Sequence, residues 1–207
     1  MTLARENTAL LVVDMQNGFL EPKGSMATIG LHHEQLRAAL PGTEKMVAAA
    51  REAGVPVIFT RYVYMPDYSD GGLLPNVLVP AMREVGALAH GSWDAEVVDS
   101  LAPHPGDIVI DKSRPSAFYG TQLEPVLTSL GIRNLVITGV TTNICVETTA
   151  RDAGQRDYQV HVVSDATAEF EKERHDHALN TIGFIFGWVN TMDEVLAGWG
   201  GATSTDG

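Results

Sequence analysis

The sequence predicts an α/β fold in which helices cover both faces of a parallel β-sheet. Short apolar runs recur along the chain, without the polar alternation of a sheet that has one solvated face. Helical patterns separate these runs, as in parallel sheets with crossover helices. The chain has 207 residues, of which 44% are hydrophobic, and this is enough to bury one core. We therefore expect a single domain over residues 1–207.

The apolar runs give the predicted strands in chain order. They span residues 8–14, 55–60, 107–111, 134–138 and 160–165, and "GFIFGWV" at 183–189 suggests a sixth, short strand. The predicted helices between and after them span residues 42–54, 121–131, 146–154 and 190–199. Gly54 is a candidate C-cap, and Thr121 and Glu124 have the spacing of a capping box.

Two segments do not fit the alternation of strands and helices. Residues 62–92 form the longest irregular stretch, and we expect a surface excursion that covers or frames a site. Residues 199–207, which end in "GGATSTDG", are small and polar and are expected to fray.

Composition excludes several classes of partner. The net charge is −12, from 26 acidic and 14 basic residues, which disfavours binding to nucleic acid or to an anionic membrane surface. No apolar run is long enough to span a membrane, and the N-terminus lacks the pattern of a signal peptide. The one cysteine cannot form an internal disulfide. We expect a cytoplasmic protein.

Three polar residues lie at or just after the ends of predicted strands. Asp14 ends the first strand, Lys112 follows the third, and Cys145 lies beyond the fourth, where a helix begins. Ligands of open parallel sheets bind beyond the carboxyl ends of the strands, so these side chains are expected to meet. A cation and a helix N-terminus lower the pKa of a thiol, and a carboxylate can accept its proton. The combination predicts a nucleophilic cysteine.

Each residue alone has another interpretation. Asp14 could cap the following turn, Cys145 could be a small buried apolar residue, and Lys112 could be solvated. The combination of the three residues favours a catalytic role.

The sequence resembles the isochorismatase-like cysteine hydrolases. The resemblance rests on "LLVVDMQNGF" at 10–19, "DKSRPSAFYGTQL" at 111–123 and "LVITGVTTNICVETTARDA" at 135–153, and it covers residues 8–198. It implies a three-layer α/β/α Rossmann-like fold with a six-stranded parallel sheet. It also implies a homo-oligomer, a dimer or tetramer, and a small-molecule amide substrate.

The resemblance implies a catalytic triad of Asp14, Lys112 and Cys145. It further implies a cis peptide between Val140 and Thr141, and an oxyanion hole formed by the backbone N–H groups of Thr141 and Cys145. In such enzymes the cysteine attacks a carbonyl, the aspartic acid protonates the leaving ammonia, and water hydrolyses a thioester. No cofactor is needed.

The metal-site motif and the cysteine distinguish the branches of this family. The nicotinamidase branch has an Asp-x-His metal site after the second strand, where this sequence has Tyr62 and Tyr64, so no metal is expected. His175 and His177 lie two residues apart in a further segment expected to be helical, where they point to different faces; they are interpreted as solvated and offer no replacement. The isochorismatase branch, which cleaves a vinyl ether, commonly lacks the cysteine. Cys145 therefore favours amide hydrolysis.

Among amidases, the sequence is most similar to the N-carbamoylsarcosine, biuret and ureidoacrylate amidohydrolases. Arg61 and Arg114 are candidates for binding a substrate carboxylate, although ion pairs within the protein explain them equally well. Candidates for lining the pocket, with packing as the alternative, are Gln16, Phe19 and Tyr119. Trp93 could wall the site or belong to an interface.

The predicted α/β fold is compatible with two other classes of function. A binding or scaffold protein on the same fold stays possible, because a fold alone proves no activity. On this view Cys145 would be accessible but slow to alkylate, whereas the enzyme would alkylate rapidly at neutral pH. A nucleotide-dependent oxidoreductase is disfavoured, because no G-x-G-x-x-G follows the first strand.

Overall fold

In the computed structural model, the described residues are 3–200, and their strands form one six-stranded parallel sheet in the order β3-β2-β1-β4-β5-β6. The strands are β1 (Thr8–Val13), β2 (Val57–Tyr62), β3 (Ile108–Lys112), β4 (Asn134–Val140), β5 (Gln159–Ala168) and β6 (Trp188–Asn190). The predicted sheet is confirmed. The predicted frayed tail lies outside the described residues except for Trp199, which ends α9, and Gly200.

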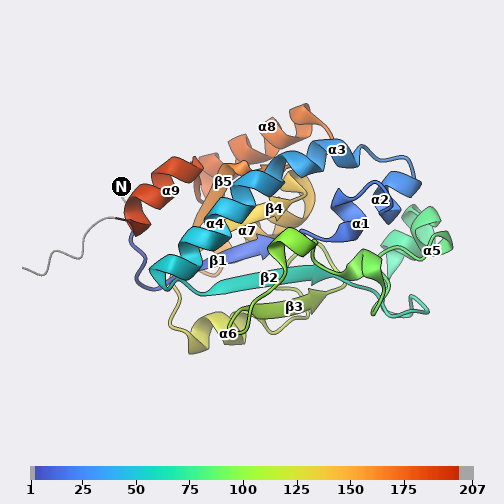
Figure 1. The fold of residues 1–207 in the computed structure, drawn as a ribbon, viewed down its shortest axis with the longest axis horizontal. Helices are drawn as coiled ribbons and strands as arrows, with labels where there is room; N and C mark the ends of the chain where they lie inside the picture. Colours follow the sequence, from blue (N-terminus) through green and yellow to red (C-terminus); the bar gives the residue numbers. More distant parts are fainter. Residues whose placement is uncertain (1–2, 201–207) are drawn as a thin grey trace, which may run out of the picture.

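Helices lie on both faces of the sheet (Figure 1). The connection from β1 to β2 and those from β3 to β4 and β4 to β5 run in opposite directions along the sheet, so right-handed crossovers would put α4 on one face and α6 and α7 on the other. The α-helices are α1 (Asn17–Leu20), α2 (Ser25–Thr28), α3 (His33–Leu36), α4 (Leu40–Ala53), α5 (Ala81–Glu84), α6 (Leu123–Ser129), α7 (Glu147–Gly154), α8 (Lys172–Thr181) and α9 (Met192–Trp199). Short 3₁₀ turns span Arg37–Ala39, Trp93–Ala95 and Asp99–Leu101, and π-helical turns span Leu74–Leu78, Thr142–Val146 and Ile182–Phe186. None of the helices in residues 3–200 is both long and apolar enough to cross a membrane.

Burial explains the apolar runs. Every residue of β1 is buried, and so is every residue of β4 except Asn134 at its start. Strands buried on both faces need continuous apolar sequence, as the pattern predicted. The carboxyl ends of β1, β3 and β4 lie at one edge of this sheet, and polar residues at or after those ends share that edge.

Helix ends agree with the sequence in one case and differ in another. Gly54 caps α4 in a left-handed conformation with φ of 71°, as expected. The predicted capping box of α6 does not form, because the helix begins later, at Leu123, after Gln122 as N-cap. Thr121 accepts a hydrogen bond from the N–H of Leu123 instead.

The sixth strand begins later than predicted. Residues Ile182–Phe186 form a π-helical turn, and the strand covers only Trp188–Asn190. Ile182 is buried in the core, but Phe184 is 84% exposed and Ile185 is 67% exposed. The apolar run at 182–189 is thus divided between core and surface. The predicted oligomer stays a prediction.

Candidate active site

The candidate site lies where the sheet changes direction. From β1, the chain builds β2 and β3 on one side and β4, β5 and β6 on the other, so β1 and β4 are neighbours at the switch point. Ligands of open α/β sheets bind in the crevice outside the strand ends at such a point. Asp14 follows β1, Lys112 ends β3, and Cys145 lies in the turn after β4. The structure brings these three predicted residues together.

Asp14 is held in a specific orientation at the end of β1. Its backbone has φ of 51°, a left-handed conformation that an aspartate tolerates better than most residues. The hydroxyl of Thr60 on β2 donates to Oδ1 at 2.7 Å, and Nζ of Lys112 donates to Oδ2 at 2.7 Å. The side chain is fully buried. A buried carboxylate with both oxygens bonded keeps one geometry.

Lys112 connects the carboxylate to the thiol. Its ammonium lies 2.7 Å from Asp14, 3.1 Å from the carbonyl oxygen of Arg114 and 3.5 Å from Sγ of Cys145. It also lies over the ring of Tyr62, 4.2 Å from the centroid. The side chain is completely buried. These four contacts hold the ammonium in place beside Cys145.

Cys145 is 3% exposed, and this burial raises the pKa of its thiol well above the ordinary value. Lys112 opposes the shift, whereas the charge of Asp14 adds to it. Burial therefore favours the neutral thiol over the thiolate before substrate binds. This differs from the expectation of rapid alkylation at neutral pH, because that expectation counted the helix N-terminus and the cation but not the burial. A slow alkylation no longer separates an enzyme from a scaffold protein.

The turn that carries Cys145 begins with the implied cis peptide, which is present between Val140 and Thr141. Thr141 is buried, and its carbonyl accepts from the N–H groups of Ile144 and Val146. The turn continues directly into α7. The nucleophile and the backbone of Thr141 are thus parts of one compact unit.

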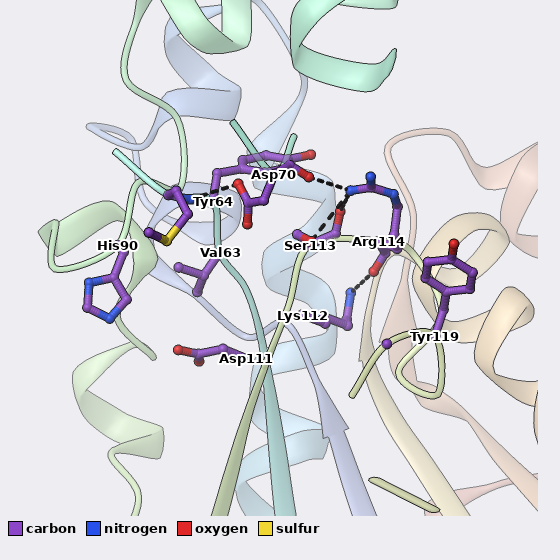
Figure 2. A pocket seen from close by; sticks show the side chains of 11 residues that line it. Val63, Tyr64, Asp70, His90, Asp111, Lys112, Ser113, Arg114 and Tyr119 are labelled. Atoms are coloured by element: carbon purple, nitrogen blue, oxygen red, sulfur yellow. Dashed lines mark hydrogen bonds between the residues drawn. The ribbon is translucent and has the colours of Figure 1, made fainter. Parts of the chain in front are cut away.

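A cleft of about 460 Å³ opens beside Lys112 (Figure 2). Arg114 and Tyr119 lie on one side of this cleft and His90 on the other, with Lys112 between them. The remaining lining residues are Val63, Tyr64, Met65, Asp70, Asp111, Ser113 and Gly120. Five of the lining residues, with His90 among them, come from the 62–92 stretch. That stretch frames the cleft, as its length predicted.

The two candidate arginines have different surroundings. Arg61 makes two hydrogen bonds to the carboxylate of Asp111 and a third to Glu96, so its guanidinium is already used within the protein. Arg114 lines the cleft and donates to the carbonyl oxygens of Asp70 and Ser113 and to the Ser113 hydroxyl. It has no carboxylate partner among residues 3–200. Arg114 is the better candidate for binding an anion.

The other candidates for lining the pocket also differ in whether they reach the cleft. Tyr119 lines the cleft and is 69% exposed. Gln16 is fully buried, where its amide exchanges hydrogen bonds with the backbone of Tyr62 and donates to the carbonyl of Ala95. Phe19 belongs to the hydrophobic core. Trp93, half exposed, is not part of the cleft wall.

Sequence reasoning missed several residues that hold or line the site. Thr60, which orients Asp14, was only the last residue of a predicted strand. Tyr64, which the sequence indicated only as a residue unable to bind a metal, lines the cleft, and its hydroxyl is buried. Burial raises the pKa of Tyr64 to about 12 and also raises that of Tyr62. Tyr64 therefore presents a neutral donor, a role that no local pattern of residues signals.

The interpretation of the two histidines needs one correction. His177 is exposed, as expected, but His175 is half-buried and its Nδ1 lies 2.8 Å from Oγ1 of Thr142. The sequence showed α8 as a surface helix but could not show that it packs on the turn of Cys145. Within residues 3–200, no three His, Cys, Asp or Glu side chains gather as metal ligands would.

Comparison with known proteins identifies the family of this chain. Residues 8–194 match the model of the isochorismatase domain. The chain belongs to the isochorismatase family. The ureidoacrylate amidohydrolase RutB of Pseudomonas syringae pv. syringae is 39% identical to this family member over 199 residues, which cover 90% of this chain and 81% of the relative.

Solved structures extend the likeness to the fold. The cysteine hydrolase of Pseudomonas syringae pv. phaseolicola superposes with a TM-score of 0.87 at 33% identity, over 97% of this chain and 95% of the other. The N-carbamoylsarcosine amidase of Thermoplasma acidophilum gives a TM-score of 0.70 at 31% identity, over 90% of this chain and 96% of the other. The predicted family and fold are confirmed.

Proposed function

We propose that this protein is a cysteine amidohydrolase that releases ammonia from a small ureido or carbamoyl compound through a thioester intermediate. The observation that carries the proposal is the buried chain Asp14–Lys112–Cys145, with contacts of 2.7 Å and 3.5 Å, beside a small cleft. Such a chain supplies a proton acceptor, a fixed cation and a nucleophile at one place.

The reaction class has the broadest support. The chain is a hydrolase of amide C–N bonds, since it belongs to the isochorismatase family and its relatives include named amidohydrolases. The sequence predicted this class. The cysteine mechanism and the substrate are the parts that we propose.

The proposed mechanism begins from a neutral thiol. As Sγ of Cys145 bonds to the substrate carbonyl carbon, the thiol proton passes to Asp14, and Lys112 stabilises the charge that develops on sulfur. The backbone N–H groups of Thr141 and Cys145 receive the carbonyl oxygen as it becomes an oxyanion, and one such donor contributes about 3 to 4 kcal/mol in other enzymes. Burial fits this order of events, because it disfavours a thiolate until substrate arrives.

The second half of the mechanism restores the enzyme. Asp14 returns its proton to the leaving nitrogen as the C–N bond breaks, and ammonia departs. Water then attacks the thioester carbon while Asp14 accepts a proton, the C–S bond breaks, and the sulfur regains its proton. Each proton that Asp14 accepts is later given back, so no cofactor is needed to balance the reaction.

The cleft suits a small polar substrate with an acidic end. Lys112 and Arg114 give its wall two cations, whereas the Asp111 carboxylate in the same wall is already bound by Arg61. The hydroxyl of Tyr64 can donate to a carbonyl or carboxylate. A volume of about 460 Å³ admits compounds of this size. The relative named ureidoacrylate amidohydrolase acts, by its name, on a ureido acid. We therefore propose N-carbamoyl or ureido acids before neutral amides.

Ammonia release tests the proposal. The substrates are ureidoacrylate, N-carbamoylsarcosine, other N-carbamoyl acids, biuret, and nicotinamide with and without added divalent metal. We expect turnover of a ureido or carbamoyl compound without metal, and its loss in Cys145→Ala and Asp14→Asn. Full activity in either variant would overturn the mechanism. Nicotinamide as sole substrate, with metal, would overturn the assignment of substrate class, and no turnover at all would favour the scaffold protein.

A further inference from the structure

The turn that carries Cys145 is held by side chains outside the cleft. Thr142 is fully buried, and its hydroxyl lies 2.8 Å from Nδ1 of His175 on α8. The N–H of the next residue, Asn143, donates to Oε2 of the buried Glu169 at 3.0 Å. The turn thus has one backbone anchor, on Glu169, and one side-chain anchor, on His175. None of these groups lines the cleft.

The chemistry of the contact between Thr142 and His175 suits a fixed position. Burial lowers the pKa of His175, and the charge of Asp176 only partly opposes this shift, so the ring is neutral at pH 7. A neutral imidazole has one donor and one acceptor nitrogen, and a hydroxyl can complement either. A buried hydroxyl that loses its partner carries a desolvation cost, which favours keeping the bond.

We propose that His175 is a positioning residue for the nucleophile, acting through the hydroxyl of Thr142. Thr142 follows Thr141, whose N–H is a proposed oxyanion donor, and precedes Cys145 by three residues in the same turn. A small rotation of the turn therefore displaces the nucleophile and the oxyanion donor together. Misplacement of reacting groups by about 1 Å can lower a rate about 100-fold. The inference rests on the proposed cysteine mechanism.

A purely structural staple between α8 and the turn would have a different signature. Its loss would lower the stability of the fold, and the remaining folded molecules would turn over substrate normally. Loss of a positioning contact instead lowers kcat in fully folded protein and leaves KM nearly unchanged, because the cleft wall does not contain the pair. The two roles are separable by steady-state kinetics.

The test compares variants at both ends of the contact. His175→Leu and Thr142→Val remove it, whereas His175→Asn can keep a polar atom near the position of Nδ1 and Thr142→Ser keeps the hydroxyl. His177→Gln is the matched control, because His177 lies on the same helix but is exposed. We expect kcat to fall about 10- to 100-fold in His175→Leu and in Thr142→Val, with KM within about threefold of wild type.

The combined variant and the rescues decide the outcome. Thr142→Val/His175→Leu should be no slower than either single variant, since both remove one contact. His175→Asn and Thr142→Ser should recover most of the lost kcat, and His177→Gln should equal wild type. Normal kcat in folded His175→Leu, additive losses in the combined variant, or an Asn variant as slow as the Leu variant would overturn the inference.

A second readout does not depend on turnover. Modification of Cys145 by iodoacetamide should be faster in His175→Leu than in wild type or His177→Gln, because a loosened turn exposes the buried thiol. Equal modification rates in folded protein would also overturn the inference. If wild-type protein hydrolyses no amide, the proposed function fails by itself, and the modification rates still decide whether His175 holds the turn.

Discussion

Removing one partner of the ion pair between Lys112 and Asp14 should strongly lower the stability of the fold. Both side chains are completely buried, and the Nζ to Oδ2 distance is 2.7 Å. Lys112→Met keeps a similar volume but leaves the Asp14 carboxylate in the core, with Thr60 as its remaining side-chain donor. Removing one partner of a buried pair typically costs about 3 to 5 kcal/mol. We expect a loss of this size in the free energy of unfolding at pH 7.

Removing both charges should cost less than removing one. In Lys112→Met/Asp14→Asn no uncompensated charge remains in the core, so the largest part of the penalty for removing one partner alone is absent. We expect the double variant to be more stable than Lys112→Met by at least about 2 kcal/mol. It should nevertheless be inactive, because it lacks both the proton acceptor and the cation.

Urea unfolding, followed by circular dichroism, measures these free energies from the midpoint and the slope. Lys172→Met is the matched control, since Lys172 pairs with Asp176 on the surface with its side chain 83% exposed, and its loss should leave the free energy of unfolding nearly unchanged. The reasoning would be refuted if Lys112→Met cost no more than Lys172→Met. A double variant less stable than Lys112→Met would refute it as well.

Further predictions concern the thiol, the sheet, the cleft and the assembly. Because burial raises the pKa of Cys145, its modification by iodoacetamide in the resting protein should rise about tenfold per pH unit to at least about pH 9, and a plateau near pH 7 would contradict this. Gly139→Ala should lower stability by at least about 2 kcal/mol in urea unfolding, because Gly139 has φ of 105° and an added Cβ would clash with the carbonyl oxygen of Val13; wild-type stability would exclude that clash. Arg114→Met should raise KM at least about tenfold for a substrate with a carboxylate but little for a neutral one, whereas Arg61→Met should leave KM unchanged; the reverse pattern would assign the anion to Arg61. Light scattering after gel filtration should give the mass of a dimer or tetramer rather than the 22.3 kDa of one chain.

Sequence alone determined the parallel sheet and the three residues of its edge. Continuous apolar runs that alternate with helical patterns indicate strands of a parallel sheet buried on both faces, and the carboxyl ends of such strands share one edge. Asp14, Lys112 and Cys145 could therefore be brought together before any contact was known. The resemblance of the surrounding motifs to the family also predicted the cis peptide between Val140 and Thr141.

Tertiary structure decided which neighbours serve these residues. Arg61 and Tyr62 are adjacent in β2, where consecutive side chains point to opposite faces, so register pairs Arg61 with Asp111 and Tyr62 with Lys112. The sequence around Arg61 and Arg114 does not show which of the two guanidinium groups is free to bind a substrate anion.

The burial of Cys145 and the contact of His175 likewise depend on elements that are distant in the chain. A thiol pKa is set by the sum of desolvation and surrounding charges, and that sum exists only after the ends of β1 and β3 and the turn at 142–146 have packed together. Local pattern specifies which residues reach the edge of the sheet, because strand geometry is local. Long-range packing specifies their protonation and orientation, because these depend on atoms that the sequence does not place side by side.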